Sequence, residues 1–232
     1  MKTRGKKYQQ VVEKVEKNKI FSIDQALEKV KQLSYVKFDE SVDIDVNVGI
    51  DPTKGDQTVR GSVVLPHGTG KKIKVLVFAR GDYADQAKKA GADYVGFEDL
   101  IEKIDAGWMD FNYTVATPDV MGQVGKLAKS LGPKGLLPNK KLGTVTFDIA
   151  DIVSDLKKGR AFFRNDKNGI VHFSFGKISF NVAMLRDNLM AFAKALIASK
   201  PSASKGKFLR KITISSTMGV GVLINPDDMV RL

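Results

Sequence analysis

The sequence predicts a two-domain protein: an antiparallel-sheet α+β domain formed by both termini, and a parallel-sheet α/β domain inserted into it. Three observations lead to this prediction. Both end segments contain strands that alternate apolar and polar residues, whereas the middle contains a continuous apolar strand followed by alternating helix and strand patterns. Stretches rich in turn-forming residues mark the two changes of pattern. The length of 232 residues also exceeds that of one common domain, about 100–150 residues.

The terminal segments supply strands with one polar face and two amphipathic helices. In residues 42–50, Val42, Ile44 and Val46 alternate with polar residues that include Asp43 and Asp45. Such one-faced alternation is typical of antiparallel sheets. Further strands are expected at 58–64, 170–175 and 211–217. Apolar stripes predict helices at 23–33, after a capping box that begins at Ser22, and at 182–196.

The middle segment follows the pattern of a parallel α/β layer. Residues 74–79 are almost continuously apolar, as expected of a strand buried on both faces. Helices should then cover 82–90, 98–106, 119–131 and 149–157, alternating with strands at 93–97, 112–116 and 143–147.

The changes of pattern define the expected domain boundaries. The discontinuous terminal domain should comprise residues 1–67 and 159–232, and the inserted domain residues 68–158. Pro66, Gly68 and Gly159 lie in the two connections. Two adjacent connections that contain glycine would make a natural hinge, so these three residues are the hinge candidates.

The charge of the chain favours a polyanionic partner, most commonly nucleic acid. There are 38 Lys and Arg against 26 Asp and Glu, a formal net charge of +12. Residues 159–232 carry +8 of this excess, and the first 65 residues carry +2. The chain has no cysteine and two histidines, so we expect neither a metal site nor a cofactor. No apolar run approaches the roughly 18 residues of a membrane span, and we expect a cytoplasmic protein.

The residues offer little support for catalysis. The Gly68–Lys72 stretch superficially resembles a phosphate-binding loop, but position 65 is Leu rather than Gly, and Lys72 stands where a metal-binding hydroxyl belongs. No nucleophile, base and orienting group can be assembled. We therefore expect a protein that is not an enzyme. The rival interpretation is an α/β enzyme that acts on a phosphorylated substrate, suggested only by the middle domain and its lysines.

Three short stretches of the terminal domain combine the groups that structured RNA requires. Hydroxyls and carboxylates can bond 2′-OH groups and base edges, cations can meet phosphates, and apolar faces can stack on bases. The stretches are Lys37-Phe38 followed by Ser41 and Asp43, the polar turn Arg164–Gly169 with its two cations, and the strand end Ser215–Gly219. The alternative is that Phe38 and Met218 belong to the core and that residues 164–169 form only a hairpin turn.

A fourth stretch, residues 131–144, follows an expected helix in the inserted domain. It mixes Gly and Pro with Lys134, Lys140 and Lys141. It is either a long solvated connection or a second, weaker nucleic-acid contact.

The sequence resembles the family of bacterial large-subunit ribosomal protein one over nearly the whole chain. The most specific match is Leu131-Gly-Pro-Lys-Gly-Leu-Leu-Pro138, followed by Gly143-Thr-Val145. The other matching stretches are Lys37–Glu40, Gly49–Pro52, Val59–Gly61, Leu65–Gly68, Gly91–Gly96, Gly107–Phe111, Ala116–Met121, Arg164–Lys167 and Ser216–Gly219.

The resemblance implies a terminal domain that binds the mobile-stalk junction of large-subunit rRNA. It also implies assistance in releasing deacylated tRNA from the exit site, and repression of translation through binding to the protein's own mRNA. By this resemblance, the family's RNA-contacting positions correspond to ten candidate residues here: Lys37, Phe38, Ser41, Asp43, Arg164, Asp166, Lys167, Thr217, Met218 and Gly219. Ser41 departs from the Thr of many relatives but keeps the hydroxyl. A free translational regulator that is not a ribosome component is the second alternative. Within the ribosome the protein is expected to be a monomer.

Overall fold

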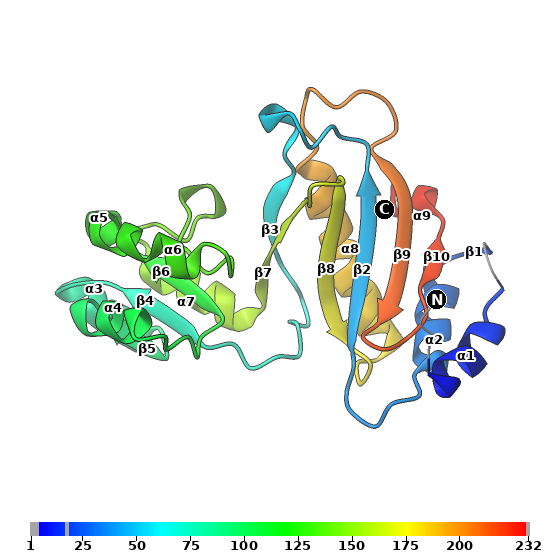
Figure 1. The fold of residues 1–232 in the computed structure, drawn as a ribbon, viewed down its shortest axis with the longest axis horizontal. Helices are drawn as coiled ribbons and strands as arrows, with labels where there is room; N and C mark the ends of the chain where they lie inside the picture. The colour runs from blue at the N-terminus through cyan, green and yellow to red at the C-terminus, as the bar shows by residue number, and fades with distance from the viewer. Residues whose placement is uncertain (1–4, 17–18, 231–232) are drawn as a thin grey trace. The chain divides into compact units, whose positions relative to one another are not determined.

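The computed structural model describes residues 5–16 and 19–230, which divide into two compact units. The terminal unit comprises the described residues up to Gly70 together with those from Ala161 onward, and the inserted unit comprises Lys71–Arg160. Figure 1 shows the course of the chain. Part of the basic N-terminal run, residues 1–4 and 17–18, lies outside the described residues.

The terminal unit is built on a five-stranded sheet with the strand order β1-β10-β9-β2-β8. Its central strand β2 pairs antiparallel with β8 and with β9, and the edge strand β1 is parallel to β10. The predicted alternation is confirmed, because every second residue of β2 is buried. The strands are β1 (Ile20–Phe21), β2 (Ser41–Val48), β8 (Ile170–Lys177), β9 (Leu209–Ser216) and β10 (Val222–Ile224).

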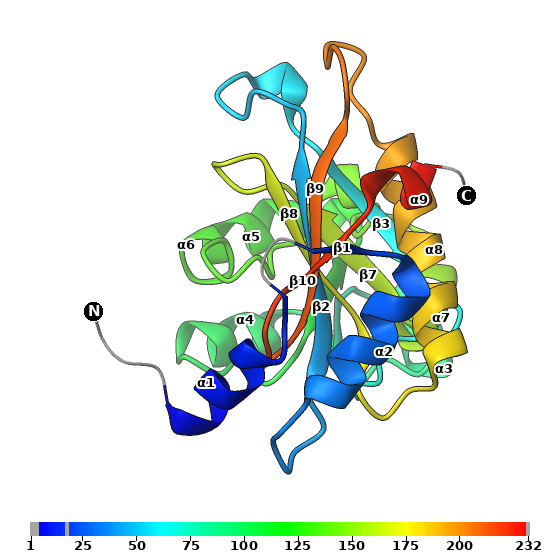
Figure 2. The same cartoon turned by 90° about the vertical axis from the view of Figure 1, so that its right-hand side faces the viewer.

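Helices cover the apolar face of this sheet. The α2 helix (Ile23–Leu33) contacts β9 and β10, and α8 (Val182–Ala198) contacts β8. Residues Val42, Ile44 and Val46 of β2 are fully buried in the core of the unit. Figure 2 shows α2 and α8 on one side of the strands and α1 (Lys6–Glu13) on the other. The polar face of β2 and β8 therefore lies opposite α2 and α8, and we call it the open face.

Smaller elements complete the terminal unit. Strands β3 (Arg60–Val64) and β7 (Arg160–Arg164) form a two-stranded sheet, and β3 contacts α8. A 3₁₀ turn, η1 (Gly55–Gln57), lies between β2 and β3, and the short α9 (Pro226–Val230) follows β10.

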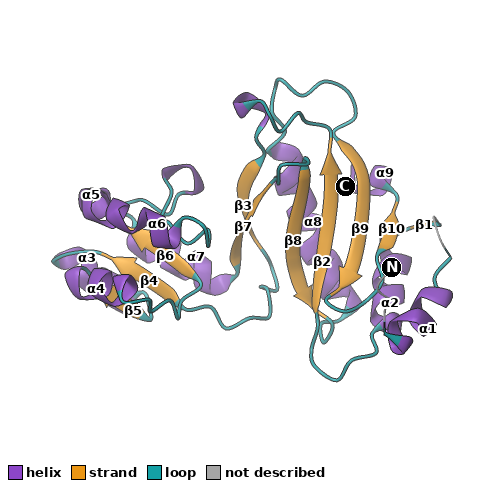
Figure 3. Cartoon of the chain, viewed as in Figure 1, coloured by secondary structure: helices purple, strands orange, loops and turns teal. Residues whose placement is uncertain are grey.

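The inserted unit is a parallel three-stranded α/β layer, as the continuous apolar strand predicts. Its order is β5-β4-β6, with β4 (Val75–Phe78) central and fully buried. Figure 3 shows the alternation of helices and strands in this unit. The other elements are α3 (Asp82–Lys89), β5 (Tyr94–Gly96), α4 (Glu98–Asp105), β6 (Tyr113–Ala116) and α7 (Ile149–Lys158). The predicted fold class, α+β with α/β, is confirmed.

Two expected elements of the inserted unit are wrong in detail. The helix expected over 119–131 is a series of short pieces: η2 (Pro118–Val120), α5 (Met121–Val124), η3 (Gly125–Leu127) and α6 (Ala128–Leu131). Gly122 and Gly125 lie within it, and glycine disfavours a continuous helix. The strand expected over 143–147 is reduced to one parallel bridge between Ala116 and Val145. The preceding stretch closes in another 3₁₀ turn, η4 (Lys140–Leu142), rather than extending along β6.

Candidate nucleic-acid interface

Nine of the ten candidate RNA-contact residues fall into two groups at opposite ends of the open face, and Asp43 lies between them. The first group, which we call the tip, consists of Lys37, Phe38, Ser41, Thr217, Met218 and Gly219. The second, which we call the turn cluster, consists of Arg164, Asp166 and Lys167. Antiparallel pairing aligns Ser41 with Lys177 and Asn47 with Ile170, so the turn cluster lies beyond the far end of β2. At about 3.3 Å per residue, the two ends of β2 are roughly 20 Å apart.

Hydrogen bonds between segments distant in sequence hold the tip together. The Thr217 backbone N–H donates to the Ser41 carbonyl oxygen at 3.1 Å. In return, the Ser41 backbone N–H donates to the Thr217 Oγ1 at 3.0 Å. The Gly219 N–H donates to the Ser216 carbonyl at 3.0 Å. A Cβ on Gly219 would lie 2.3 Å from the Ser216 Oγ, so any other residue here would force the Ser216 side chain to move.

A buried carboxylate braces the tip from behind. Glu40 is only 1% exposed. Its two oxygens accept hydrogen bonds from the Met218 backbone N–H at 2.8 Å and from the Ser34 hydroxyl at 2.6 Å. A buried carboxylate must have hydrogen-bond donors to offset its loss of water, and here those donors belong to the two segments that form the tip.

The tip presents two large apolar side chains to solvent. Phe38 is 54% exposed and Met218 is 49% exposed, so the alternative that they are core residues is wrong. The Met218 backbone is nevertheless fixed, because the Tyr35 hydroxyl donates to its carbonyl at 3.0 Å. Exposed apolar side chains on a fixed backbone suit contact with a partner rather than folding of the chain.

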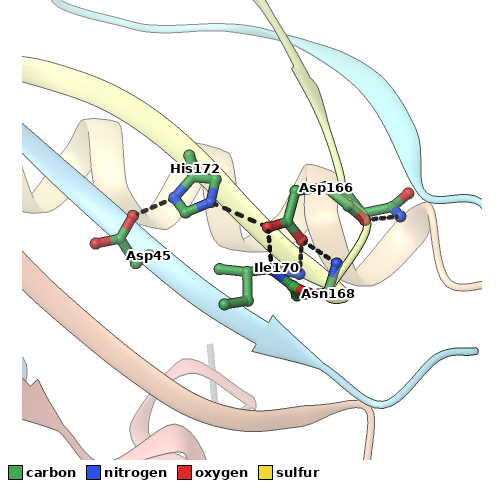
Figure 4. Close-up of polar contacts among 6 residues, drawn as sticks. Asp45, Asp166, Asn168, Ile170 and His172 are labelled. Atoms are coloured by element: carbon green, nitrogen blue, oxygen red, sulfur yellow. Dashed lines mark hydrogen bonds and ion pairs between the residues drawn. The ribbon is translucent and has the colours of Figure 1, made fainter. Parts of the chain in front are cut away.

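The middle of the open face carries Asp43 and a histidine flanked by two carboxylates. Asp43 lies in β2 opposite Ser174 on one side and Ser215 on the other. Farther along the face, His172 Nδ1 lies 2.6 Å from an Asp45 oxygen and its Nε2 lies 3.7 Å from an Asp166 oxygen (Figure 4).

Asp166 shapes the turn that bears the two cations of the turn cluster. One of its oxygens accepts the backbone N–H groups of Ile170 at 2.7 Å and of Asn168 at 2.8 Å. The hydrogen bond from Ile170, followed by that from Asn168 and the neighbouring His172, lowers the pKa of Asp166 below its usual value. Arg164 and Lys167 stay exposed on this turn. The segment is thus a hairpin turn, and the same turn also presents cations to solvent.

Two residues that the sequence interpretation missed also contribute to this interface. Lys177 brings a cation to the tip, where its Nζ donates to the Ser41 Oγ and to the Asp39 carbonyl, both at 3.1 Å. The other is Glu40, which lies buried behind the tip. Glu40 was missed because carboxylates are rarely buried. Strict alternation of β8 would place Lys177 on the apolar side with Val171, Phe173 and Phe175, and the irregularity opposite Val42 and Asp43 returns it to the polar face, so the sequence pattern could not have revealed it.

The inserted unit contains a separate cationic segment. Residues 121–146 include Lys126 and Lys129 as well as Lys134, Lys140 and Lys141, and they contain no Asp or Glu. Asn139 caps the turn that bears two of these lysines, since its side chain accepts the Lys141 backbone N–H at 2.8 Å. The stretch is therefore partly ordered rather than an extended solvated connection.

The candidate hinge residues differ in how they are held. Pro66 is exposed, and Gly68 and Gly159 both have positive φ angles, +63° and +112°. The buried Asn188 of α8 fixes the first connection to the terminal unit. Its Nδ2 donates to the Gly68 carbonyl at 2.9 Å, and its Oδ1 accepts the His67 N–H at 3.0 Å. Any freedom of this connection must therefore begin after Gly68.

Comparison with known proteins agrees with the resemblance seen in the sequence. A family model described as the Ribosomal protein L1p/L10e family matches residues 29–220. Relatives named "Large ribosomal subunit protein uL1" from several strains of Thermus thermophilus are each 53% identical over 227 residues. The alignments cover 97% of this chain and 99% of each relative.

The fold and these matches define the class of the protein: it is a structural protein of the large ribosomal subunit and not an enzyme. More particularly, the chain belongs to the Ribosomal protein L1p/L10e family. The rival interpretation as an α/β enzyme is thereby set aside. Among residues 5–16 and 19–230, no helix is both long and apolar enough to span a membrane.

Proposed function

We propose that this large-subunit ribosomal protein binds the mobile-stalk junction of large-subunit rRNA through the open face of its terminal unit. It would act as a monomer within cytoplasmic ribosomes and need no cofactor. The observation that carries the proposal is the tip, where Phe38 and Met218 stand exposed on a backbone fixed by Glu40 and by the Ser41–Thr217 pair.

Each group of the open face has a distinct role in this proposal. Phe38 and Met218 supply flat or flexible apolar surfaces for unstacked bases. Ser41, Asp43 and Thr217 hydrogen-bond 2′-OH groups and base edges, which gives selectivity for one folded junction. Lys37, Lys167 and Arg164 bind phosphates, which gives affinity and a steep dependence on salt. Asp166 stabilises the turn that presents Lys167 and Arg164. Gly219 has no side chain and lets RNA approach the backbone.

The substitution Met218→Asp tests the role of the tip. It should weaken binding to stalk-junction RNA by ~1–3 kcal/mol, the scale of one specific contact, because a carboxylate would face the RNA. Met218→Leu is the matched control and should bind like wild type, since it keeps an apolar side chain. Equal affinity of all three proteins in a filter-binding titration, with folding verified by circular dichroism, would remove Met218 from the interface.

We further propose that the stalk moves with the protein to assist release of deacylated tRNA from the exit site. Lys134, Lys140 and Lys141 would form a weak second contact with nucleic acid from the inserted unit. Replacing all three by Gln should spare rRNA affinity and slow tRNA departure in a single-turnover translocation assay. A loss of rRNA affinity would instead move the main site to the inserted unit.

The free protein would also repress translation by binding a similar RNA fold in its own mRNA. The alternative is a translational regulator that does not join the ribosome. Co-sedimentation separates the two: the proposal expects the tagged chain to remain with large subunits after a wash at moderate salt. Its recovery only in the free fraction, together with binding to its mRNA, would favour the regulator.

A further inference from the structure

Two loops meet at the end of β2 that is opposite the tip. The Val48 N–H donates to the Gly169 carbonyl at 2.9 Å on one side, and the Gly49 N–H donates to the Phe208 carbonyl at 2.6 Å on the other. The buried Ser204 hydroxyl also donates to the Gly49 carbonyl at 2.8 Å. The loop after α8 is thereby fixed beside the turn cluster. Figure 2 shows both loops at the same end of the sheet.

Glycine at position 49 makes this close approach possible. A Cβ at this position would lie 2.4 Å from the Lys207 carbonyl oxygen, which is far inside van der Waals contact. The same hypothetical atom would lie 3.3 Å from the Arg210 Nε, so the Arg210 side chain runs alongside Gly49. Backbone contacts, the Ser204 hydroxyl and one ion pair, between Lys207 and Asp227, hold this loop in place.

The loop therefore carries cations that its own anchoring does not use. Residues 200–211 contain five Lys and Arg and no acid. Lys207 pairs with Asp227 at 2.9 Å. Lys205, Arg210 and Lys211 are exposed, and no ion pair with any residue of 5–16 or 19–230 involves them. Exposed cations without carboxylate partners remain available for phosphate.

The strand register places one of these cations on the open face itself. Lys211 lies directly opposite Asn47, and cross-strand neighbours share a face of the sheet. Asn47 follows Asp43 and Asp45 on the polar side of β2. The irregularity between Asn47 and Val48 leaves Arg210 without a partner in this register, and its side chain lies at the end of the strand. The same end of the sheet therefore carries four cations: Lys211, Arg210, Lys167 and Arg164.

From this arrangement we propose that Lys205, Arg210 and Lys211 bind sugar–phosphate backbone of the same RNA whose bases contact the tip. The RNA-binding surface would then extend over the full length of β2, roughly 20 Å. The tip would select the RNA, and the distant cations would add affinity without discriminating between sequences. This inference rests on the proposed rRNA-binding function and adds a second contact region to it.

The triple variant K205Q/R210Q/K211Q tests the inference in the full-length protein. Each lost phosphate contact reduces the slope of log affinity against log salt by about 0.7–0.9, so three contacts predict a reduction of about 2. The triple variant should lose RNA affinity by the same factor for the stalk-junction RNA and for a variant RNA with altered loop bases. The control K89Q/K103Q/K194Q removes the same charge from exposed positions on α3, α4 and α8 and should keep the wild-type slope.

The possible results separate this inference from the function on which it rests. If the wild type fails to bind stalk-junction RNA, the proposed function itself is wrong. If the wild type binds and the triple variant keeps its affinity and slope, only the extended surface is wrong. A slope reduced equally in the triple variant and the control would also overturn the inference, because it would reflect net charge alone. Thermal melting verifies that both variants are folded.

Discussion

Single residues decide whether the candidate interface can hold its shape. Glu40 stabilises the tip by accepting two buried hydrogen bonds. Asp166 stabilises the turn cluster by accepting two backbone N–H groups of its own turn. The identity of such residues is only partly predictable. The sequence placed Asp166 in a polar turn, but it could not decide between core and contact for Phe38 and Met218. Either role suits an apolar side chain, and only the packing of the whole unit leaves these two exposed.

The lowered pKa of Asp166 predicts how the turn responds to acid. Because the folded-state pKa lies below the unfolded value of about 3.9, ionised Asp166 stabilises the fold above that pH. This contribution is lost as pH falls through the folded-state value. Asp166→Asn should therefore lower the melting temperature at neutral pH, and the difference from wild type should shrink below about pH 4. A difference that is unchanged down to the acid transition would contradict the assigned role.

Among the elements, the long and strongly patterned ones were predictable, and several of the short ones were not. The alternation of β2 and the apolar stripes of α2 and α8 extend over enough residues to reveal their period. Strands β1, β7 and β10 contain two, five and three residues, too few for a reliable period. The five-stranded sheet provides partners for β1 and β10, and β3 provides the partner for β7. The expected strand at 143–147 failed because only Val145 meets β6.

The contact between α8 and the first connection predicts a stability effect at one position. Asn188 is fully buried and bonds the backbone of His67, Gly68 and Phe175. Asn188→Leu should lower the free energy of unfolding by ~1–3 kcal/mol, because buried backbone groups would lose their partners. Asp187→Asn is the neighbouring control. It alters only an exposed contact with the His67 ring and should cost less than about 1 kcal/mol. Equal urea midpoints for both variants would contradict this assignment.

At the scale of the whole molecule, the two units have separate cores and sheets. The terminal unit buries one continuous apolar cluster, and the inserted unit has a cluster of its own. The change from one-faced to fully apolar strands made this organisation visible in the sequence. The assignment of RNA binding to the terminal unit remains a proposal.

A deletion tests that assignment directly. Removing residues 71–160 and joining Gly70 to Ala161 through a short Gly-Ser linker should leave a cooperatively folding protein, because the core of the terminal unit is intact. It should bind stalk-junction RNA within a few-fold of the full chain, measured by filter binding. A deletion protein that is folded by circular dichroism but does not bind would refute the division of roles between the units.

The bond between Glu40 and Met218 also has a consequence for the order of events during synthesis. It joins residues 178 positions apart, and β2 finds its partners β8 and β9 only in the last third of the chain. A growing polypeptide on the ribosome therefore exposes Phe38 long before Met218 exists to complete the tip. Under the proposed function, RNA recognition would become possible only near the end of translation, and unfinished or truncated chains would not compete with the complete protein for RNA.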